Sequence, residues 1–369
     1  MKTLLRLLLK SQHQRNRSGP AQTDKGMTLV ELLVGSIMAF LILTPMLAFV
    51  VDMLNTDRRE QVKTSTEQDI QAAVDFIAQD LSQAIYIYDN KAINGPPGVN
   101  EERVISQLPT NANGRPILVF WKRKQIRNAV DPQQPPQRTP DDCAQATANQ
   151  PNSPNVCNDT YVRSLVAYYL VREQTPNSTW CQPSATDCPS RIERYEISEG
   201  VKDPRLPLPN QNGYFNEGEV SESQEHSPAF NSNFDFNQPT KNVTVPQGFT
   251  DPNFTGSNPQ VLVNYIDQSA LVPTPPGNEC QLALGEPRAQ VGGTTTTSPI
   301  LEETLKVTDQ EATNSFYACV DTARNVARVT IRGNSLRRLQ TNGTAYDPNK
   351  SAFFPTASVQ VQGLGGLGK

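Results

Sequence analysis

The feature that most constrains this chain is an apolar run at residues 27–51, MTLVELLVGSIMAFLILTPMLAFVV, in which Glu31 is the only charged side chain. A helix rises about 1.5 Å per residue, so this run would extend roughly 37 Å as a helix. That length exceeds the ~30 Å hydrocarbon core of a lipid bilayer. The run therefore predicts a membrane-spanning helix.

A cleaved secretory signal is the competing interpretation of the run. The apolar part of such a signal usually has about 7 to 15 residues, fewer than the run contains. Met46, Leu47 and Ala48 also make a poor cleavage site of the small-x-small type. We therefore expect the run to stay in the mature protein. An uncleaved single-pass anchor is a further alternative.

Charge divides the chain at the apolar run. Residues 1–26 hold six Lys or Arg and one Asp, a net charge of +5. The whole chain carries −4, which leaves −9 for residues 27–369. A basic flank, an apolar span and an acidic body are typical of a cytoplasmic flank, a membrane segment and an exported domain. The acidic body also argues against nucleic acid as a partner.

Beyond the run the apolar residues change to helical spacing. They recur at steps of three and four along one face, while polar residues such as Asp75 and Asp80 fall on the other. Residues 52–94 contain no Pro or Gly, so we expect one helix to continue to about Tyr88. Pro45 lacks an amide donor, and we expect a kink or local unwinding there. The apolar face consists of Ile70, Ala73, Val74, Ile77, Leu81, Ala84 and Ile85.

Several short segments rich in β-branched and aromatic residues predict strands. The last two are joined by Asp-Thr-Ala-Arg-Asn and predict a hairpin. We expect an α+β fold, in which the second half of the helix packs on an antiparallel sheet that covers its apolar face. The expected strands are Pro116–Trp121, Leu165–Arg172, Arg191–Ser198, Val261–Ile266, Phe316–Val320 and Val326–Arg332.

These patterns divide the chain into five parts. Two stretches of the head are dense in Pro, Asn, Gln and Ser, at 127–160 and 202–260, and we expect surface insertions or partly disordered loops there. The chain ends in GLGGLGK at 363–369, which predicts a flexible end. The parts are a basic leader (1–26), the membrane helix (27–51), its amphipathic continuation (52–88), a β-rich exported head (89–345) and a C-terminal tail (346–369).

All six cysteines lie beyond the apolar run, and none forms a C-x-x-C pair. An even number on the exported side predicts disulfides, formed in an oxidising compartment. Cys181 and Cys188 close a small loop in a turn-rich segment, so we expect them to be bridged. The count does not fix connectivity, and a mixture of bridges and free thiols stays open. The remaining expected pairs are Cys143 with Cys157 and Cys280 with Cys319.

The junction before the apolar run reads Lys25-Gly26-Met27-Thr28-Leu29-Val30-Glu31. Its basic leader ending in glycine, the hydrophobic residue that follows and the glutamate fifth after the glycine resemble the class III signal of type IV prepilins and type II secretion pseudopilins. The resemblance covers about residues 25–88 and implies a pilin-like fold. It implies that prepilin peptidase cuts after Gly26 and that the new amine of Met27 is methylated. Thr28, Leu29 and Glu31 would then belong to the assembly segment of a filament subunit.

Glu31 is unfavourably placed, since an ionised side chain within an apolar helix is rare without a partner. Cleavage would create such a partner, because the nitrogen of Met27 is an amide in the precursor and a cation in the mature chain. The resemblance implies that this glutamate pairs with the N-terminus of a neighbouring subunit. A Glu31 that merely faces lipid headgroups is the alternative.

The resemblance also implies partners and a location. The precursor would cross the inner membrane once, in contact with lipid, with its head in the periplasm. An inner-membrane assembly platform would then combine it with other pilin or pseudopilin subunits into a cell-envelope filament. The size, the Pro/Asn-rich insertions and the cysteines are similar to pseudopilins of cyanobacterial hormogonium polysaccharide secretion, which would add polysaccharide as a partner and gliding motility as a role.

The sequence offers little material for catalysis. His13 and His226 are the only histidines, so neither a His-based triad nor a multi-histidine metal site can be assembled. We expect no enzyme, no catalytic residue and no metal or other required cofactor. Calcium is the one ion with candidate ligands, in oxygen-rich loops at Asp251–Asn253 and Asn231–Asp235.

Two other functions fit the same architecture. A filament-tip adhesin or glycan-binding head would need exposed aromatic rings, for which Trp180 and the pair Tyr214 and Phe215 are candidates. Trp121 and Tyr168 lie within expected strands and should be buried instead. A single-pass membrane protein with a periplasmic sensor domain is the third interpretation.

Overall fold

The computed structural model describes most of the chain after residue 27. The chain divides into two compact units, residues 1–58 and 59–369, and each is described by itself. The described residues are 28–95, 104–109, 113–133, 139–140, 142–143, 157–175, 178–181, 188–203, 213–215, 220, 226–235, 237–241, 243–244, 259–269, 277–286, 300–308 and 314–365.

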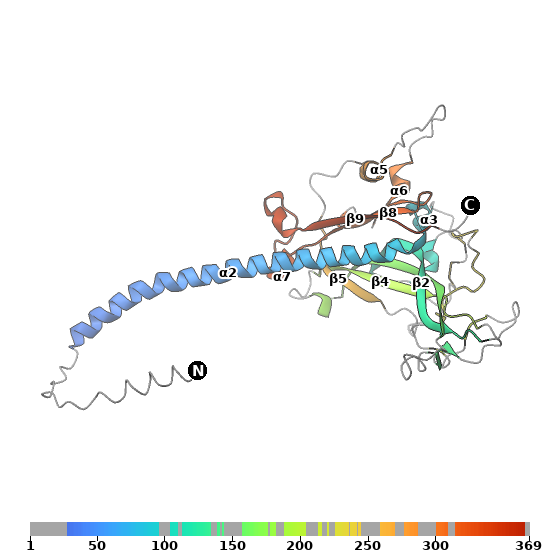
Figure 1. Ribbon diagram of the computed structural model, residues 1–369. Coiled ribbons are helices and arrows are strands. Elements are labelled where there is room, and N and C mark those ends of the chain that lie inside the picture. The colour runs from blue at the N-terminus through green and yellow to red at the C-terminus, as the bar shows by residue number, and fades with distance from the viewer. Residues whose placement is uncertain are drawn as a thin grey trace. The chain divides into compact units, whose positions relative to one another are not determined.

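Helix α2 (Leu29–Ser82) has 54 residues and includes the apolar run and its amphipathic continuation (Figure 1). The helix continues through Pro45, so the local unwinding expected there is absent. Proline removes only one amide donor from the helix. The residue before Pro45, Thr44, donates its hydroxyl to the carbonyl of Phe40 at 2.8 Å. The helix therefore continues on both sides of the proline.

The first sheet has five strands in the order β1-β2-β3-β4-β5, and every neighbouring pair is antiparallel. Its first strand corrects the expected helix end at Tyr88, because α2 stops at Ser82 and the next residues pair with β2 instead. β2 and β3 also extend into the expected insertion at 127–160. The strands are β1 (Ala84–Ile87), β2 (Gly114–Val130), β3 (Asn158–Arg172), β4 (Ser190–Ser198) and β5 (Gln260–Ile266).

A second sheet has the order β6-β7-β8-β9 and is also antiparallel. β7 and β8 form the hairpin that the sequence predicts. We expected a single sheet, and the second arises because β6 and β9 pair with the two outer edges of this hairpin. β9 lies within residues 346–369, so that part is not simply a tail. The strands are β6 (Lys306–Thr308), β7 (Phe316–Asp321), β8 (Val326–Arg332) and β9 (Thr356–Gln362).

Short helical segments connect the strands. The first of them follows β1 directly, and Asp89 caps it by accepting a hydrogen bond from the amide of Ala92 at 2.8 Å. These segments are α3 (Asn90–Asn94), η2 (Val104–Gln107), η3 (Thr179–Cys181), α5 (Glu279–Leu284), α6 (Glu302–Leu305), α7 (Leu336–Leu339) and η6 (Pro348–Phe353).

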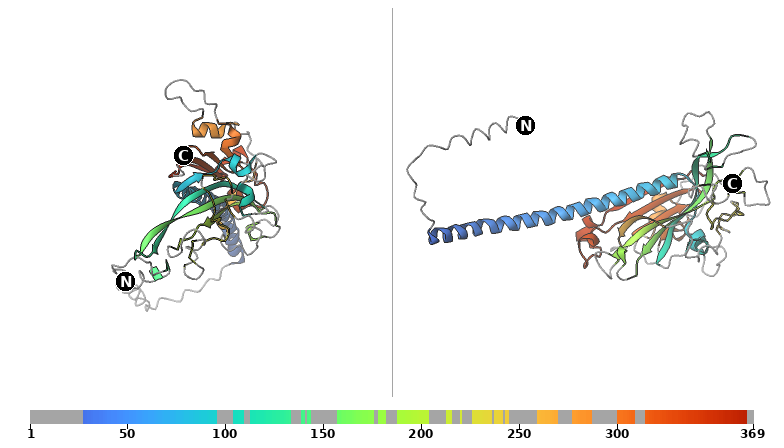
Figure 2. Two further views of the ribbon diagram at one scale, coloured as in Figure 1. Left: turned by 90° about the vertical axis from the view of Figure 1, so that its right-hand side faces the viewer. Right: turned by 90° about the horizontal axis from the view of Figure 1, so that it is seen from below.

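The second half of α2 runs beside both sheets (Figures 1 and 2), and its apolar face is buried in a core shared with them. This confirms the amphipathic pattern of the sequence. Trp121 and Tyr168 are buried in the same core, as expected. Phe230 and Phe234 pack on the ring of Trp121, with ring centroids 5.9 and 4.8 Å away. Part of the 202–260 insertion therefore closes the core.

The glycine-rich end of the chain is docked as far as residue 365. The amide of Gly363 donates to the carbonyl of Asn325 at 2.9 Å, and that of Gly365 donates to the carbonyl of Ala84 at 3.3 Å. A Cβ atom on Gly363 would lie only 2.4 Å from the carbonyl oxygen of Ala84. Glycine stands here because the backbones approach closely, which corrects the expected flexible end from residue 363.

Gly363→Ala should therefore lower the free energy of unfolding by about 1–3 kcal/mol, the usual cost of overpacking. Urea unfolding of the full chain in detergent, followed by the fluorescence of the buried Trp121, measures this loss. Gly277→Ala is the matched control, because a Cβ there meets no atom within 4 Å. Equal stability of the two variants would contradict the close contact between Gly363 and Ala84.

Candidate functional site

The first candidate site is the start of α2. Gly26 and Met27 lie outside the described residues, and Thr28 is the first residue described. The hydroxyl of Thr28 accepts a hydrogen bond from the amide of Glu31 at 3.3 Å. Its carbonyl accepts one from the amide of Leu32 at 3.1 Å. Thr28 is thus the N-cap of the helix that begins at Leu29, and its Thr-x-x-Glu spacing is that of a capping box.

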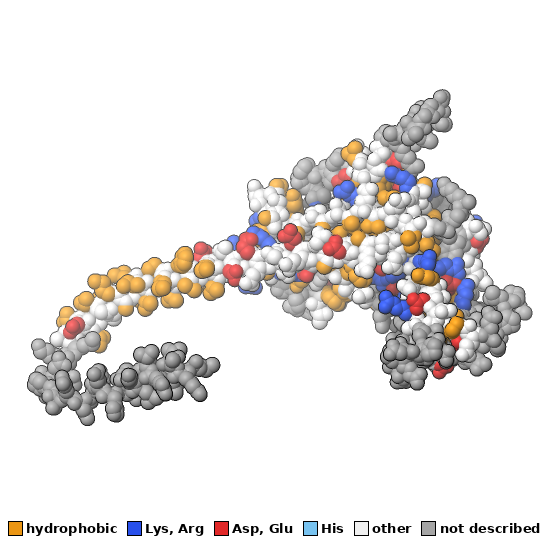
Figure 3. Space-filling model, in the orientation of Figure 1, with side chains coloured by type: hydrophobic (Ala, Val, Ile, Leu, Met, Phe, Trp, Pro, Cys, Tyr) orange, Lys and Arg blue, Asp and Glu red, His pale blue; other side chains and the backbone are white. Residues whose placement is uncertain are grey.

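The surface of the helix after this cap is apolar on every side. Its large hydrophobic side chains between Leu29 and Leu54 are exposed, and Figure 3 shows hydrophobic groups covering this segment. The helix is long and apolar enough to cross a membrane, and none of its most apolar window is buried. This surface therefore needs lipid or other apolar helices around it.

Glu31 is the one charged side chain of the apolar run at residues 27–51, and the described part of the chain leaves it unsatisfied. The hydroxyl of Ser36 donates to the carbonyl of Leu33 at 2.8 Å, so it is satisfied within the helix, as is that of Thr44. The carboxylate of Glu31 accepts no hydrogen bond and forms no ion pair with any residue from 28 onwards that the structure describes. A partner for it must come from outside this part of the chain.

A second candidate is a cluster of charged groups between α2 and the first sheet, here called the Asp80 cluster. It consists of Asp80, Lys122, Tyr168, Arg194 and Glu196. Asp80 accepts hydrogen bonds from the amine of Lys122 at 2.8 Å, the guanidinium of Arg194 at 2.7 Å and the hydroxyl of Tyr168 at 2.6 Å. Arg194 also binds Glu196 at 2.7 Å. Asp80 was expected on the outer face of the helix, and its burial corrects that expectation.

The charges in the Asp80 cluster hold its carboxyl groups in their ionised form. Burial raises the pKa of Asp80, but the positive charges of Lys122 and Arg194 outweigh it and bring the pKa below its ordinary value. Burial likewise raises the pKa of Glu196, while Lys122, Lys124 and Arg194 lower it to about 2. Because both oxygens of Asp80 are occupied by donors, the cluster fixes α2 on the sheet rather than leaving a base for proton transfer.

Three disulfides join the six cysteines. They are Cys143–Cys157, Cys181–Cys188 and Cys280–Cys319, the same pairs named from the sequence. The second links η3 to the residues before β4, and the third links α5 to β7. Bridged cysteines fit an oxidising compartment.

The calcium candidates find no support among the residues described. In Asn231–Asp235 the side-chain oxygens of both end residues accept hydrogen bonds from amides two residues on, at 3.0 and 2.9 Å. The described residues contain no group of three or more His, Cys, Asp or Glu that could hold a metal. Asp251–Asn253 lies outside them.

The prediction that Trp180, Tyr214 and Phe215 expose their rings for sugar binding is partly wrong. Phe215 is buried and cannot offer its ring. Tyr214 is half-buried and packs on His226, with ring centroids 4.4 Å apart. Trp180 is 36% exposed and carries the guanidinium of Arg191 over its ring at 4.9 Å. The more exposed ring is that of Tyr161, at 52%, which the sequence analysis did not select.

Comparison of the chain with protein-family models, with curated proteins and with solved structures gives no match.

Asp80→Asn should lower the free energy of unfolding at pH 7 by about 3–5 kcal/mol, because it leaves two buried cations, Lys122 and Arg194, with only Glu196 to balance them. Thermal unfolding of the full chain in detergent measures this loss. Asp75→Asn is the matched control, since Asp75 is exposed on the same helix. Similar stability of the two variants would contradict the role of the Asp80 cluster in fixing α2 on the first sheet.

The Asp80 cluster also predicts a pH dependence. Carboxyl groups with lowered pKa values stabilise the fold fully above their unfolded pKa and lose that contribution as the pH falls. The unfolded values are 3.8 for Asp80 and 4.5 for Glu196, and the folded value for Glu196 is about 2. Wild-type stability should therefore hold above about pH 5 and fall between about pH 4.5 and 2. Asp80→Asn should flatten that fall, and an unchanged slope would show that other carboxylates cause it.

Proposed function

We propose that this chain is a non-catalytic minor pilin or pseudopilin with a pilin-like fold, which assembles through α2 into an envelope filament. The filament would belong to a type IV pilus or a type II secretion-like system. The observation that carries the proposal is the setting of Glu31. It is a carboxylate without a described partner on an apolar helix, close behind a Gly26-Met27 junction of the prepilin type.

Cleavage after Gly26 would change the start of the helix in two ways. It would remove a leader with a net charge of +5, which opposes withdrawal of the helix from the bilayer. It would also turn the nitrogen of Met27 into a cation. Glycine suits the cleaved position, because a residue without a side chain lets the peptidase approach the backbone closely. The apolar helix would then be free to leave lipid for a filament.

In the filament, Glu31 would pair with the Met27 amine of a neighbouring subunit. Both charges lose water there, and burying them costs about as much as their attraction returns, so the pair would select register more than it would add stability. The exposed apolar side chains of α2 would supply contact area, first to lipid and then to neighbouring helices. Thr28 and Leu29 would set the point at which this helix begins.

The head would be the exported part of the subunit. Its disulfides suit the periplasm, and the Asp80 cluster keeps residues of α2 within the head in register with the first sheet. Prepilin peptidase, the inner-membrane assembly platform and other subunits would be its partners. Polysaccharide secretion and gliding motility are the setting that its size and insertions favour.

The filament-tip adhesin and the single-pass sensor each differ from the proposed filament subunit in one respect. A filament-tip adhesin would use the same helix and differ only in what its head binds. A single-pass sensor would keep its leader and never leave the bilayer. The N-terminus of the mature protein separates the sensor from both kinds of filament subunit.

The mature chain should begin at N-methylated Met27, and Gly26→Val should leave a full-length precursor in the membrane, with processing lowered by roughly a hundredfold or more, a loss of ~2.7 kcal/mol. Intact-mass analysis of the purified membrane fraction measures both. Gly35→Val, eight residues into the mature helix, should be processed normally. A wild-type chain that keeps residues 1–26 would refute the proposal.

Glu31→Gln and Glu31→Leu should both be processed and stay in the membrane, yet enter filaments roughly tenfold less than wild type or worse. Each variant leaves the neighbouring amine without an anion. Immunoblots of sheared filaments and of membrane fractions measure the ratio. Asp52→Asn removes a charge from the exposed surface of the same helix and is the control. Wild-type amounts of both Glu31 variants in the sheared fraction would favour a Glu31 that only faces headgroups.

A further inference from the structure

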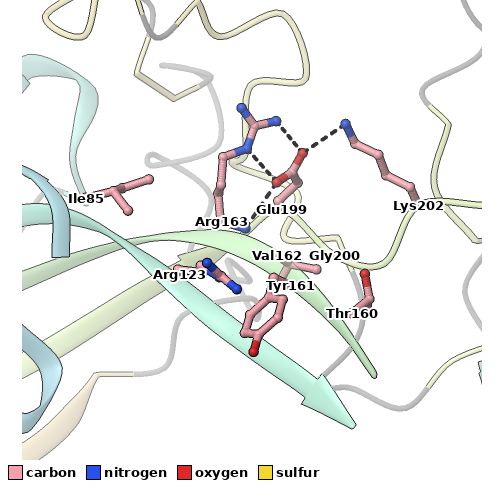
Figure 4. Close-up of a pocket in the computed structure, with 9 residues that line it drawn as sticks. All are labelled: Ile85, Arg123, Thr160, Tyr161, Val162, Arg163, Glu199, Gly200 and Lys202. Carbon is pink, nitrogen blue, oxygen red and sulfur yellow. Dashed lines mark hydrogen bonds and ion pairs between the residues drawn. The ribbon is translucent and has the colours of Figure 1, made fainter. Parts of the chain in front are cut away.

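A pocket opens beside the first sheet, lined by residues of β2, β3 and the segment after β4 (Figure 4). Its volume is about 360 Å³. Of its lining side chains, Arg123, Arg163 and Lys202 are cationic and Glu199 is the only acid, a net charge of +2. Ile85, Thr160 and Tyr161 supply apolar surface and hydroxyl groups. A cationic pocket is notable on a chain whose residues 27–369 carry −9.

The two arginines stand directly opposite each other, Arg123 on β2 and Arg163 on β3. Like charges in this position destabilise a sheet unless something neutralises them. Glu199 does so for Arg163, accepting hydrogen bonds from its Nε at 2.7 Å and from its backbone amide at 3.1 Å. Among the described residues, no carboxylate pairs with Arg123.

The carboxylate of Glu199 has no free acceptor site for Arg123, because other donors already occupy it. Besides Arg163, it receives the amine of Lys202 at 3.3 Å and the hydroxyl of Tyr214 at 3.4 Å. Its side chain is almost fully buried. Burial raises the pKa of Glu199, but its hydrogen bonds and the charge of Arg163 bring the pKa below its ordinary value, so it stays ionised.

Arg123 is held by an aromatic ring instead. Its guanidinium carbon lies 3.6 Å from the centre of the Tyr161 ring. Stacking orients the guanidinium plane and leaves the N–H groups at its edge, which can bind a carboxylate with two parallel hydrogen bonds. The amine of Lys202 borders the same pocket with a side chain that is largely exposed.

We propose that this pocket binds a carboxylate- or sulfate-bearing sugar unit. Arg123 would hold the acidic group with two hydrogen bonds, and Lys202 would add positive charge to the same pocket, while Tyr161 and Thr160 would contact the ring and hydroxyls of the sugar. This inference assigns a ligand class and a binding site to the head, and it does not rest on filament assembly.

The volume and lining of the pocket suit a saccharide better than a bare ion. The volume accommodates more than an inorganic anion. Tyr161 combines an apolar ring with a hydroxyl, a pairing that suits a ligand with both apolar C–H groups and hydroxyls.

Isothermal titration of the full-length protein in detergent with a tetrasaccharide of uronic acids tests the proposal. Wild type should bind it, and Arg123→Gln should weaken binding at least tenfold. Lys202→Gln and Tyr161→Ala should each weaken it severalfold. Lys350→Gln removes an exposed cation of η6 outside the pocket and should bind as wild type does. Arg123→Lys keeps the charge but loses the two-pronged geometry and should fall between wild type and Arg123→Gln.

Four results would overturn the proposal. Wild type could fail to bind the acidic tetrasaccharide, or Arg123→Gln could bind it as tightly as wild type while keeping the wild-type melting temperature. Sodium sulfate or tetraglutamate could bind the wild type as tightly as the sugar, which would show that the pocket recognises charge alone or an acidic peptide. Maltotetraose, which is neutral, could bind equally well, which would remove the role of the cations.

Discussion

The apolar face of α2 between residues 70 and 81 has to be covered, and the head is organised around that requirement. Ile70, Val74 and Ile77 are buried in a core to which both sheets contribute. Apolar contact alone is not directional and would let the helix turn or slide on a sheet. Asp80 removes that freedom, because its oxygens accept hydrogen bonds from groups on three strands. A buried carboxylate of this kind fits one register, and any shift would leave charges unpaired in the core.

The same helix therefore carries two kinds of surface. In its second half, each buried group finds its partner within the chain. In its first half, apolar side chains are exposed and the carboxylate of Glu31 has no described partner. Exposed apolar surface of this extent marks a place where lipid or protein must bind. In the proposed function, this contrast between the two halves of α2 would link the fold to assembly.

Strong periodicity made much of this fold predictable: the helical spacing of residues 70–81, the six main strands and the β7–β8 hairpin all follow from local patterns. The sequence-based predictions are wrong where a contact with a residue far along the chain determines the structure. Residues 84–87 suit a helix or a strand equally, and pairing with β2 selects the strand. Gly363 looks like part of a flexible end until the carbonyl of Ala84 is placed beside it. The polar spacing of Asp80 put it on the outer face, because its cations are 42 and 114 residues away. The paired arginines depend on strand register, which the sequence alone did not provide.

The charged side chains of this chain differ in whether a described group of opposite charge lies beside them. Asp80, Glu196 and Glu199 each lie among donors that hold them ionised. Glu31 and Arg123 differ, because neither has a described group of opposite charge beside it. Water stabilises both charges in the free chain, since both side chains are exposed. A partner that displaces this water must bring the opposite charge, or the desolvated ion would cost several kcal/mol. On the two proposals made above, the start of the helix would select a cation and the pocket would select an anion, because any other partner would leave a desolvated charge unpaired.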